Sequence, residues 1–224
     1  FKYYDSVIYK GIELTNRDII SISYGGQITF WDKLSTKSYR AEKRENLKDE
    51  ELFDVLQISD EILVFATECC LRFFDIDSYE NTDTIRGVEI NRNNCLVLFD
   101  DYYLLVLLKN EVGIFDINKK SMINSFDISK GKLDSIALLQ NGNIIVGISN
   151  NNYSNSESEL LLREYEFIEG KTYCIGEKKE IIAKVDESDY TRFSPLMILK
   201  NGIIVYGTIG TEDKKLCGII SVLN

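Results

Sequence analysis

A short pattern of hydrophobic residues recurs along the chain. Each copy begins with a turn of Asp, Asn or Gly and continues with a short run rich in Ile, Val, Leu, Phe and Tyr. Short apolar runs bounded by turn residues are typical of β-strands, and some alternate apolar and polar positions, as residues 20–23 do. The corresponding apolar residues, separated by 43, 41, 41 and 59 positions, are Ile19, Ile62, Tyr103, Ile144 and Ile203. The pattern predicts repeated copies of one β-structural unit.

An aromatic residue followed by Asp marks the first three copies at the same place. The pairs, at intervals of 43 and 41 positions, are Trp31-Asp32, Phe74-Asp75 and Phe115-Asp116. A weaker copy is Tyr165-Glu166. Two markers that keep the same order and period predict units of four antiparallel strands, with the aromatic–Asp pair at the end of the third strand. We expect the aromatic rings to be buried between neighbouring sheets and the Asp residues to bond a turn, so that these are folding residues.

Turn residues and polar stretches refine this prediction. Asn-Gly at 141–142 and at 201–202 predicts type I′ hairpin turns, with inner strands at 144–148 and 203–207. Residues 41–52 are the single helical candidate, and a solvated loop is the favoured alternative. The longer fourth interval is assigned to two polar stretches, 149–159 and 177–191, of which the first is expected to be a loop.

The period and the aromatic–Asp pairs resemble those of the WD40-repeat family. The chain departs from the family in having no Gly-His dipeptide and only one Trp-Asp pair. The resemblance implies an all-β fold, a single β-propeller domain of four-stranded antiparallel blades at about 1–46, 47–86, 87–128, 129–185 and 186–224. Two arrangements stay open: a closed five-blade ring in which residues 1–4 complete the last blade, or a fragment of a six- or seven-blade ring.

Composition excludes several classes of function. The 224 residues include no His, which excludes Ser–His–Asp and Cys–His catalysis and His-ligated metals. Asp and Glu number 36 against 26 Lys and Arg, a net charge of −10 that disfavours nucleic acid and anionic membranes as partners. No glycine-rich phosphate-binding motif occurs, and residues 75–83 depart from a calcium loop at its fifth and sixth positions. We therefore predict no catalytic, cofactor-binding or metal site and no cofactor.

The cysteines point to a reducing compartment. The chain has five, with Cys69 and Cys70 adjacent and no Cys-x-x-Cys motif. Free structural thiols and a cytoplasmic location are the simple interpretation. Because the sequence begins with Phe1 rather than Met, we expect it to be a module of a larger protein or complex.

The family resemblance implies a function in protein–protein interaction, as a non-catalytic scaffold. The alternative is an enzyme propeller with its substrate over the central channel. For the scaffold we expect a protein or peptide partner at the face formed by the turns between second and third strands and by the links between units, where loops offer recognition surface. Acidic residues there favour a basic partner, and those of the candidate face are Asp49, Glu50, Glu51, Glu68, Glu111, Glu157 and Glu159. The sequence does not specify the oligomeric state.

Overall fold

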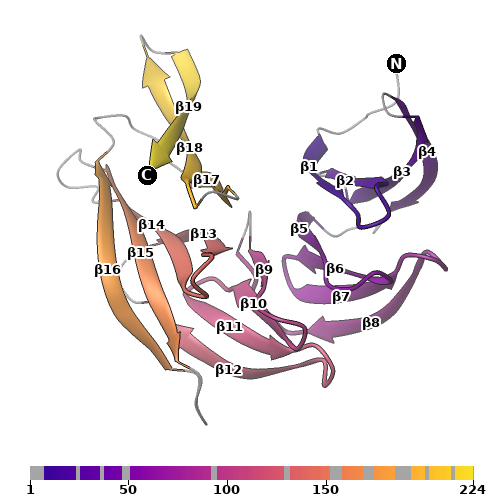
Figure 1. Ribbon diagram of the computed structural model, residues 1–224, viewed down its shortest axis with the longest axis horizontal. Helices are drawn as coiled ribbons and strands as arrows, with labels where there is room; N and C mark the ends of the chain where they lie inside the picture. The colour runs from indigo at the N-terminus through magenta and orange to yellow at the C-terminus, as the bar shows by residue number, and fades with distance from the viewer. Residues whose placement is uncertain are drawn as a thin grey trace. The chain divides into compact units, whose positions relative to one another are not determined.

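A computed structural model of the chain consists of antiparallel β-sheets (Figure 1). It describes residues 8–23, 26–35, 38–46, 51–91, 95–128, 132–151, 158–168, 174–184, 193–199, 202–212 and 215–223. No helix occurs among these residues, and their strands form five sheets in which each strand pairs with the next along the chain. Each sheet falls inside one of the five sequence-derived unit ranges.

The first two sheets have four strands each. Sheet 1 contains β1 (Ile8–Glu13), β2 (Ile19–Ser23), β3 (Gln27–Ser35) and β4 (Ser38–Asn46). Sheet 2 contains β5 (Leu52–Gln57), β6 (Ile62–Thr67), β7 (Cys70–Asp75) and β8 (Glu80–Arg86).

The remaining described strands form two further four-stranded sheets and one of three strands. Sheet 3 contains β9 (Leu96–Leu98), β10 (Tyr103–Leu107), β11 (Glu111–Asp116) and β12 (Ser121–Asp127). Sheet 4 contains β13 (Lys132–Leu138), β14 (Ile144–Asn151), β15 (Ser158–Ile168) and β16 (Cys174–Lys184). Sheet 5 contains β17 (Phe193–Ile198), β18 (Ile204–Glu212) and β19 (Lys215–Leu223). The segment 1–4, which would complete the last blade in a closed five-blade ring, lies outside the described residues.

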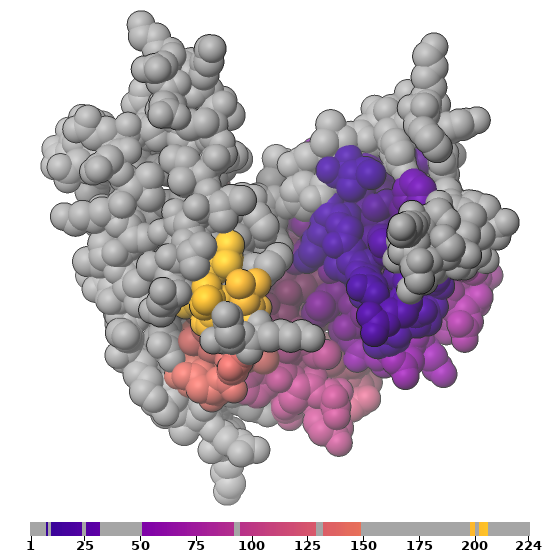
Figure 2. All heavy atoms as spheres, turned by 45° about the horizontal axis from the view of Figure 1, so that its top comes forward, coloured from indigo at the N-terminus to yellow at the C-terminus, as the bar shows by residue number. Residues whose placement is uncertain are grey.

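The chain divides into two compact units, Phe1–Ile90 and Asn91–Asn224. Sheets 1 and 2 belong to the N-terminal unit, and sheets 3, 4 and 5 to the C-terminal unit. Figure 2 shows in colour the residues whose side chains are described, most of which lie between 8 and 31 and between 51 and 148. The arrangements below are therefore given within each unit.

The second strand of each of the first four sheets is mostly buried, which agrees with its nearly continuous apolar sequence. In the N-terminal unit the apolar side chains of sheets 1 and 2 form one cluster that includes Ile20, Phe30, Phe65 and Phe74. Phe74 stacks on Phe30 and meets Phe65 edge-on, with both centroid distances 5.7 Å. Sheets 1 and 2 are therefore held together by aromatic and aliphatic packing rather than by strand pairing.

A bulge recurs in the first strand of four sheets. One residue of that strand has no partner opposite it, and the four such residues are Tyr9, Phe53, Asp134 and Pro195. The only proline of the chain thus occupies a bulge in an edge strand, where the missing N–H does not interrupt the ladder. The bulge is a repeated feature of the unit that the sequence pattern did not reveal.

A second bulge lies in the fourth strand, beside the aromatic marker. The ladder between third and fourth strands slips by one residue between Phe30 and Trp31, and in the same way before the other aromatic markers. The unpaired residues are Glu42, Thr82, Ile123 and Lys178. Trp31, Phe74, Phe115 and Tyr165 therefore share one register position, so the weak fourth copy belongs to the repeat.

Three expectations about elements were wrong. Residues 41–46, for which a helix or a loop was expected, are strand, because β4 runs through Asn46; the next strand, β5, starts at Leu52. Strand β14 extends to Asn151 and β15 starts at Ser158, so both ends of the stretch 149–159 are paired strand. Strand β3 continues past Asp32 to Ser35, beyond the Asp that was expected to end it, whereas β7 and β11 do end at the Asp of the pair. Residues 177–184 of the second polar stretch, for which no structure was predicted, belong to β16. The sheets are longer than the apolar runs because polar outer strands also pair.

Candidate functional site

The turns between first and second strands all have the same closing hydrogen bond. In each, the N–H of the residue that opens the turn donates to the carbonyl oxygen four positions later. These bonds measure 2.7–3.0 Å and join Leu14 to Asp18, Ile58 to Ile62, Phe99 to Tyr103, Leu139 to Asn143 and Leu199 to Ile203. In an antiparallel meander these turns and those between third and fourth strands lie at the same end of the sheet. We call this the turn end.

The Asn-Gly turns differ from the type expected. Gly142 and Gly202 have φ of +82°, and their N–H groups donate to Leu139 and Leu199 at 3.0 and 2.8 Å. Asn141 is not among the residues with positive φ, so the 141–142 turn is a three-residue loop with one left-handed residue and not a type I′ turn. Arg17 takes the corresponding place in sheet 1 with φ of 77°.

Side-chain oxygens shape the other two turns. Asp100 Oδ1 accepts from the N–H groups of Tyr102 and Tyr103, both at 2.8 Å. Ser59 Oγ accepts in the same way from Glu61 and Ile62, at 3.4 and 3.1 Å. Asp100 therefore bonds the backbone of its own turn, and its role is structural.

The Asp of the aromatic–Asp pair organises the turn between third and fourth strands. Asp75 Oδ1 accepts the Ser78 N–H at 2.7 Å, and Asp116 Oδ1 accepts the Lys119 N–H at 2.8 Å. These backbone bonds are the main reason that the pKa of each carboxyl lies below its ordinary value. The residue after each of these bonds, Tyr79 or Lys120, has φ of 58° or 50°. Asp32 has no described side chain.

Both kinds of turn are joined within a sheet. The N–H of Ile76 donates to the carbonyl of Glu61 at 2.8 Å, and the N–H of Ile117 donates to that of Tyr102 at 2.9 Å. Each bond connects the start of the later turn to the earlier one. The turn end is therefore held by backbone bonds as well as by the Asp side chains.

A pocket of about 130 Å³ opens at the turn end of the N-terminal unit. It lies between the β1–β2 turn with β3 of sheet 1 and the β7–β8 turn of sheet 2. Its lining combines aromatic rings, two carboxylates and a few aliphatic groups. The lining residues are Leu14, Asn16, Asp18, Ile19, Phe30, Trp31, Ile76, Asp77 and Tyr79. None of these nine residues carries a positive charge.

The aromatic side of the pocket is fixed from behind. The Trp31 indole N–H donates to the buried Ser21 hydroxyl at 2.8 Å, and the ring of Tyr79 meets that of Phe30 edge-on at 4.8 Å. Trp31 is only partly buried, unlike Phe74 at 4% and Phe115 at 1% exposure. Trp31 is therefore less completely buried than its two counterparts, and its side chain lines the pocket.

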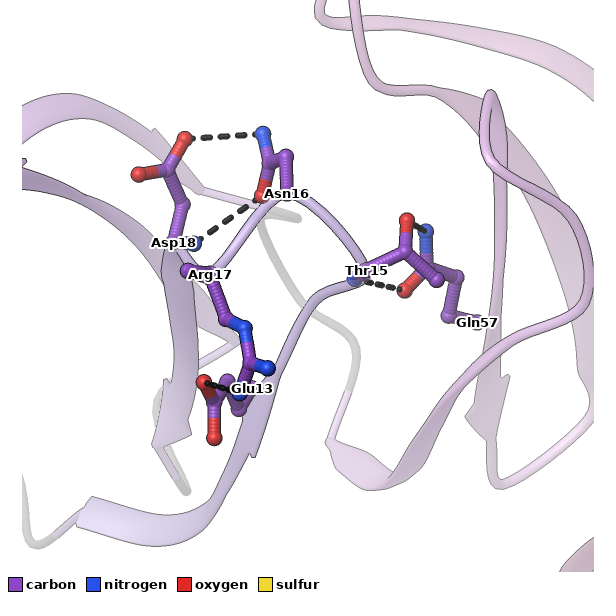
Figure 3. A network of polar contacts seen from close by, with 6 residues as sticks. All are labelled: Glu13, Thr15, Asn16, Arg17, Asp18 and Gln57. Carbon is purple, nitrogen blue, oxygen red and sulfur yellow. Dashed lines mark hydrogen bonds and ion pairs between the residues drawn. The ribbon is translucent and has the colours of Figure 1, made fainter.

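The β1–β2 turn is anchored to sheet 2 beside the pocket (Figure 3). Gln57 Oε1 accepts the Thr15 N–H at 2.9 Å, and Gln57 Nε2 donates to Thr15 Oγ1 at 3.1 Å. Within the turn, Asn16 Oδ1 accepts the Asp18 N–H and Asn16 Nδ2 donates to Asp18 Oδ2, both at 2.9 Å. Figure 3 shows Arg17 turned instead toward Glu13, with an ion pair of 3.1 Å.

A partly buried ion pair also links the first strands of these two sheets. Lys10 of β1 donates to Asp54 of β5, which is fully buried and also accepts the Val55 N–H at 2.8 Å. Removing one partner of a buried pair leaves an uncompensated charge, so such a pair resists separation of the two strands. The ion pair therefore helps to hold together the two sheets whose turns form the pocket.

None of the described acidic residues that were predicted to contact a partner lines the pocket. Glu51, just before β5, and Glu68, in the β6–β7 turn, are exposed at the opposite end of sheet 2 from the pocket. Glu111 is half-buried at the start of β11. Glu159 lies in β15, and only its backbone is described; the others, Asp49, Glu50 and Glu157, are outside the described residues. The backbone carbonyl of Glu68 accepts the Ile90 N–H at 3.3 Å.

The remaining chemical candidates occupy structural positions. Cys69, Cys70 and Cys95 are free thiols, and Cys70 is buried with its sulfur 3.0 Å from Thr67 Oγ1. Within the described part of the chain, no group of three His, Cys, Asp or Glu residues could hold a metal. A search of the same residues finds no helix suited to crossing a membrane. Residues 75–83 form the β7–β8 turn and the start of β8.

Sequence reasoning missed the pocket. The signal was present but distributed: the single Trp stands where two other repeats have Phe, and Tyr79 stands where sheet 3 has Lys120. These two departures from the repeat indicate a site only because the packing of sheets 1 and 2 places Trp31 and Tyr79 around the same pocket. In the structure, Trp31 occupies the register position of Phe74 and Phe115, and Tyr79 occupies that of Lys120.

Comparison with known proteins identifies the fold. No family model and no curated protein sequence matches the chain. The crystal structure of the WD40 β-propeller domain of Doa1 is similar to 91% of this chain, with a TM-score of 0.62 and 16% sequence identity. The fold is WD40-like. This chain covers 60% of the Doa1 domain's chain, so the number of blades and the closure of the ring stay predictions. At this identity the similarity shows a fold and no particular activity.

Proposed function

We propose that this WD40-like chain is a protein-interaction module, a non-catalytic scaffold that binds a protein or peptide partner and works within a larger protein or complex. The observation that carries the proposal is the pocket at the turn end of the N-terminal unit. At about 130 Å³ it is well below the roughly 300–1,000 Å³ of small-molecule sites. It accommodates one side chain of a partner.

The framework around the pocket suits such a role. Sheets 1 and 2 share an aromatic core, the partly buried Lys10–Asp54 pair and the Gln57–Thr15 hydrogen bonds. A surface held in place before binding loses little conformational entropy when a partner docks. The fold supports the same function only in general terms, because WD40 propellers host many different partners.

The test is capture of a partner by the complete chain. We expect the immobilised protein to retain a binding partner at near-equal stoichiometry from a lysate of its source cell at low salt. Two controls are the same protein unfolded in urea and refolded, and a bait carrying Phe74→Ala, which is expected to loosen the shared core of sheets 1 and 2. Recovery of no stoichiometric partner by the folded bait would contradict the proposal.

A further inference from the structure

The pocket at the turn end joins aromatic rings to negative charge. Phe30, Trp31 and Tyr79 contribute rings, and Asp18 and Asp77 contribute carboxylates. A cation over an aromatic face is attracted by the ring quadrupole, and a carboxylate within reach adds a direct attraction. Resting on the interaction function above, we propose that this pocket binds one Lys or Arg side chain of the protein partner.

The arginine of the β1–β2 turn pairs away from the pocket. Arg17 lies between Asn16 and Asp18 in the sequence, yet its guanidinium pairs with Glu13 at 3.1 Å. The Asn16 amide orients Asp18 through its bond to Oδ2. The turn therefore presents a carboxylate at the pocket, while its own arginine pairs with Glu13 along β1.

The size of the pocket selects the end of a side chain. A cavity of about 150 Å³ holds a benzene molecule, and this pocket has about 130 Å³. A nucleotide or an organic cofactor is too large. A guanidinium or ammonium group with the last part of its methylene stem fits both the volume and the mixed apolar and acidic lining.

The aromatic ring of Tyr79 is not required by the turn. The equivalent left-handed position in sheet 3 is Lys120, which forms the same kind of turn after Asp116. A Tyr in a left-handed conformation is uncommon, and such residues are found where a site needs them. The side chain of Tyr79 therefore contributes something other than the turn: it packs edge-on against Phe30 and lines the pocket.

Fluorescence of Trp31 measures occupancy of the pocket directly, because this is the only Trp in the chain. The probes are the N-acetyl methylamides of arginine and lysine, titrated at low salt. Citrulline and norleucine methylamides serve as neutral controls of similar shape. We expect a saturable change with the cationic probes only, with a dissociation constant in the range of about 1–100 mM that suits a single side chain.

Two variants separate the two halves of the pocket. Asp18→Asn with Asp77→Asn removes both charges and keeps the shape, and Tyr79→Asn removes the ring at a position where Asn tolerates positive φ. Each is expected to weaken arginine binding about tenfold or more. Asp60→Asn with Asp101→Asn changes the net charge equally at exposed turns outside the lining, and it should leave binding within about twofold.

The outcomes also distinguish this proposal from the interaction function. Equal binding of citrulline and arginine, no saturable change with any probe, or unchanged arginine binding in the double Asp variant would each overturn the cation pocket. If the captured partner of the wild-type chain is retained equally by that variant, the pocket proposal fails and the interaction function stands. If neither protein captures a partner, the interaction function fails.

Discussion

At the scale of single residues, the aromatic–Asp pair combines two tasks in adjacent positions. The aromatic side chain stands beside the fourth-strand bulge, and the Asp that follows accepts a backbone N–H three positions later. The bulge re-aims the outer strand while the carboxylate fixes the turn that leads into it. This coupling explains why the two residues recur together at a constant period.

The lowered pKa of Asp116 gives this turn a pH dependence. A carboxylate whose pKa is lower in the folded than in the unfolded state stabilises the fold at pH above the ordinary value of 3.8, and the contribution is lost as the pH falls through the lowered pKa. We expect Asp116→Asn to lower the free energy of unfolding at neutral pH. The difference in the free energy of unfolding between the variant and the wild type should become smaller as the pH falls below 3.8. Urea unfolding at several pH values measures this difference.

Asp75 provides an independent repeat of the same experiment. It makes the equivalent bond to Ser78 and has its pKa lowered for the same first reason, but it lacks the ion pair that Asp116 forms with Lys119 at 2.9 Å. For Asp75→Asn, the difference in the free energy of unfolding from wild type should therefore also shrink in acid, and it should depend less on salt. If the difference in the free energy of unfolding stays constant with pH for both variants, these carboxylates do not stabilise the fold through their charge.

Sequence alone could find these residues but not their surroundings. The recurrence of Trp31, Phe74 and Phe115 with a following Asp depends only on order along the chain, so the register could be predicted. The exposure of Trp31 could not, because it depends on Ser21 on the neighbouring strand and on Tyr79 from another sheet. Contacts between sheets leave no periodic trace in the sequence.

At the scale of elements, outer strands were the least predictable. Strands β8 and β12 show no buried residue and no regular alternation of exposed and half-buried positions, because the outermost strand of a sheet has few neighbours to pack against. The charged stretch 41–46 also belongs to an outermost strand, β4, and was mistaken for a loop or helix. Inner strands such as 144–148 were predictable, since burial on both faces demands a continuous apolar run.

The left-handed residue of the first-turn loops can be tested at Gly142. A Cβ at this position would meet nothing within 4 Å, so Gly142→Ala isolates the backbone cost of φ at +82°. We expect a loss of about 1–2 kcal/mol in the free energy of unfolding. The measurement is the midpoint of urea unfolding at unchanged slope.

Gly11 provides the matched control in a strand. Its Cβ would lie 3.6 Å from the Ile20 carbonyl oxygen, an ordinary contact, and its φ is not positive. Gly11→Ala is expected to stabilise by about 0.5–1 kcal/mol, because glycine in a strand has more entropy to lose. Equal effects of the two substitutions would show that the Asn-Gly loop carries no conformational requirement.

At the scale of the whole molecule, the acidic excess and the pocket act on different steps of binding. Under the proposed function, the net charge of −10 is expected to attract a basic partner over long range and so to affect how often the two molecules meet. The pocket acts only at contact, where an anchored side chain affects how long they stay together. Composition predicted the first of these effects, whereas the second depends on the packing of two sheets.

The two ends of sheet 2 allow these effects to be separated. Glu51 and Glu68 are exposed at the end that the sequence favoured, and Asp18 and Asp77 line the pocket at the turn end. We expect Glu51→Lys with Glu68→Lys to lower the association rate of the basic partner at low salt and to have little effect on dissociation. Asp18→Asn with Asp77→Asn should instead raise the dissociation rate about tenfold, with a smaller change in association.

Surface plasmon resonance with the captured partner, from low to physiological ionic strength, measures both rates. Salt screens exposed charges over a Debye length of about 8 Å at 0.15 M, so the effect of the lysine variant should fade as salt rises while that of the pocket variant persists. If the lysine variant instead raises the dissociation rate and the pocket variant does not, the partner is anchored at the end with the β6–β7 turn. In that case the sequence-predicted face is the binding surface, and the aromatic pocket is not its anchor.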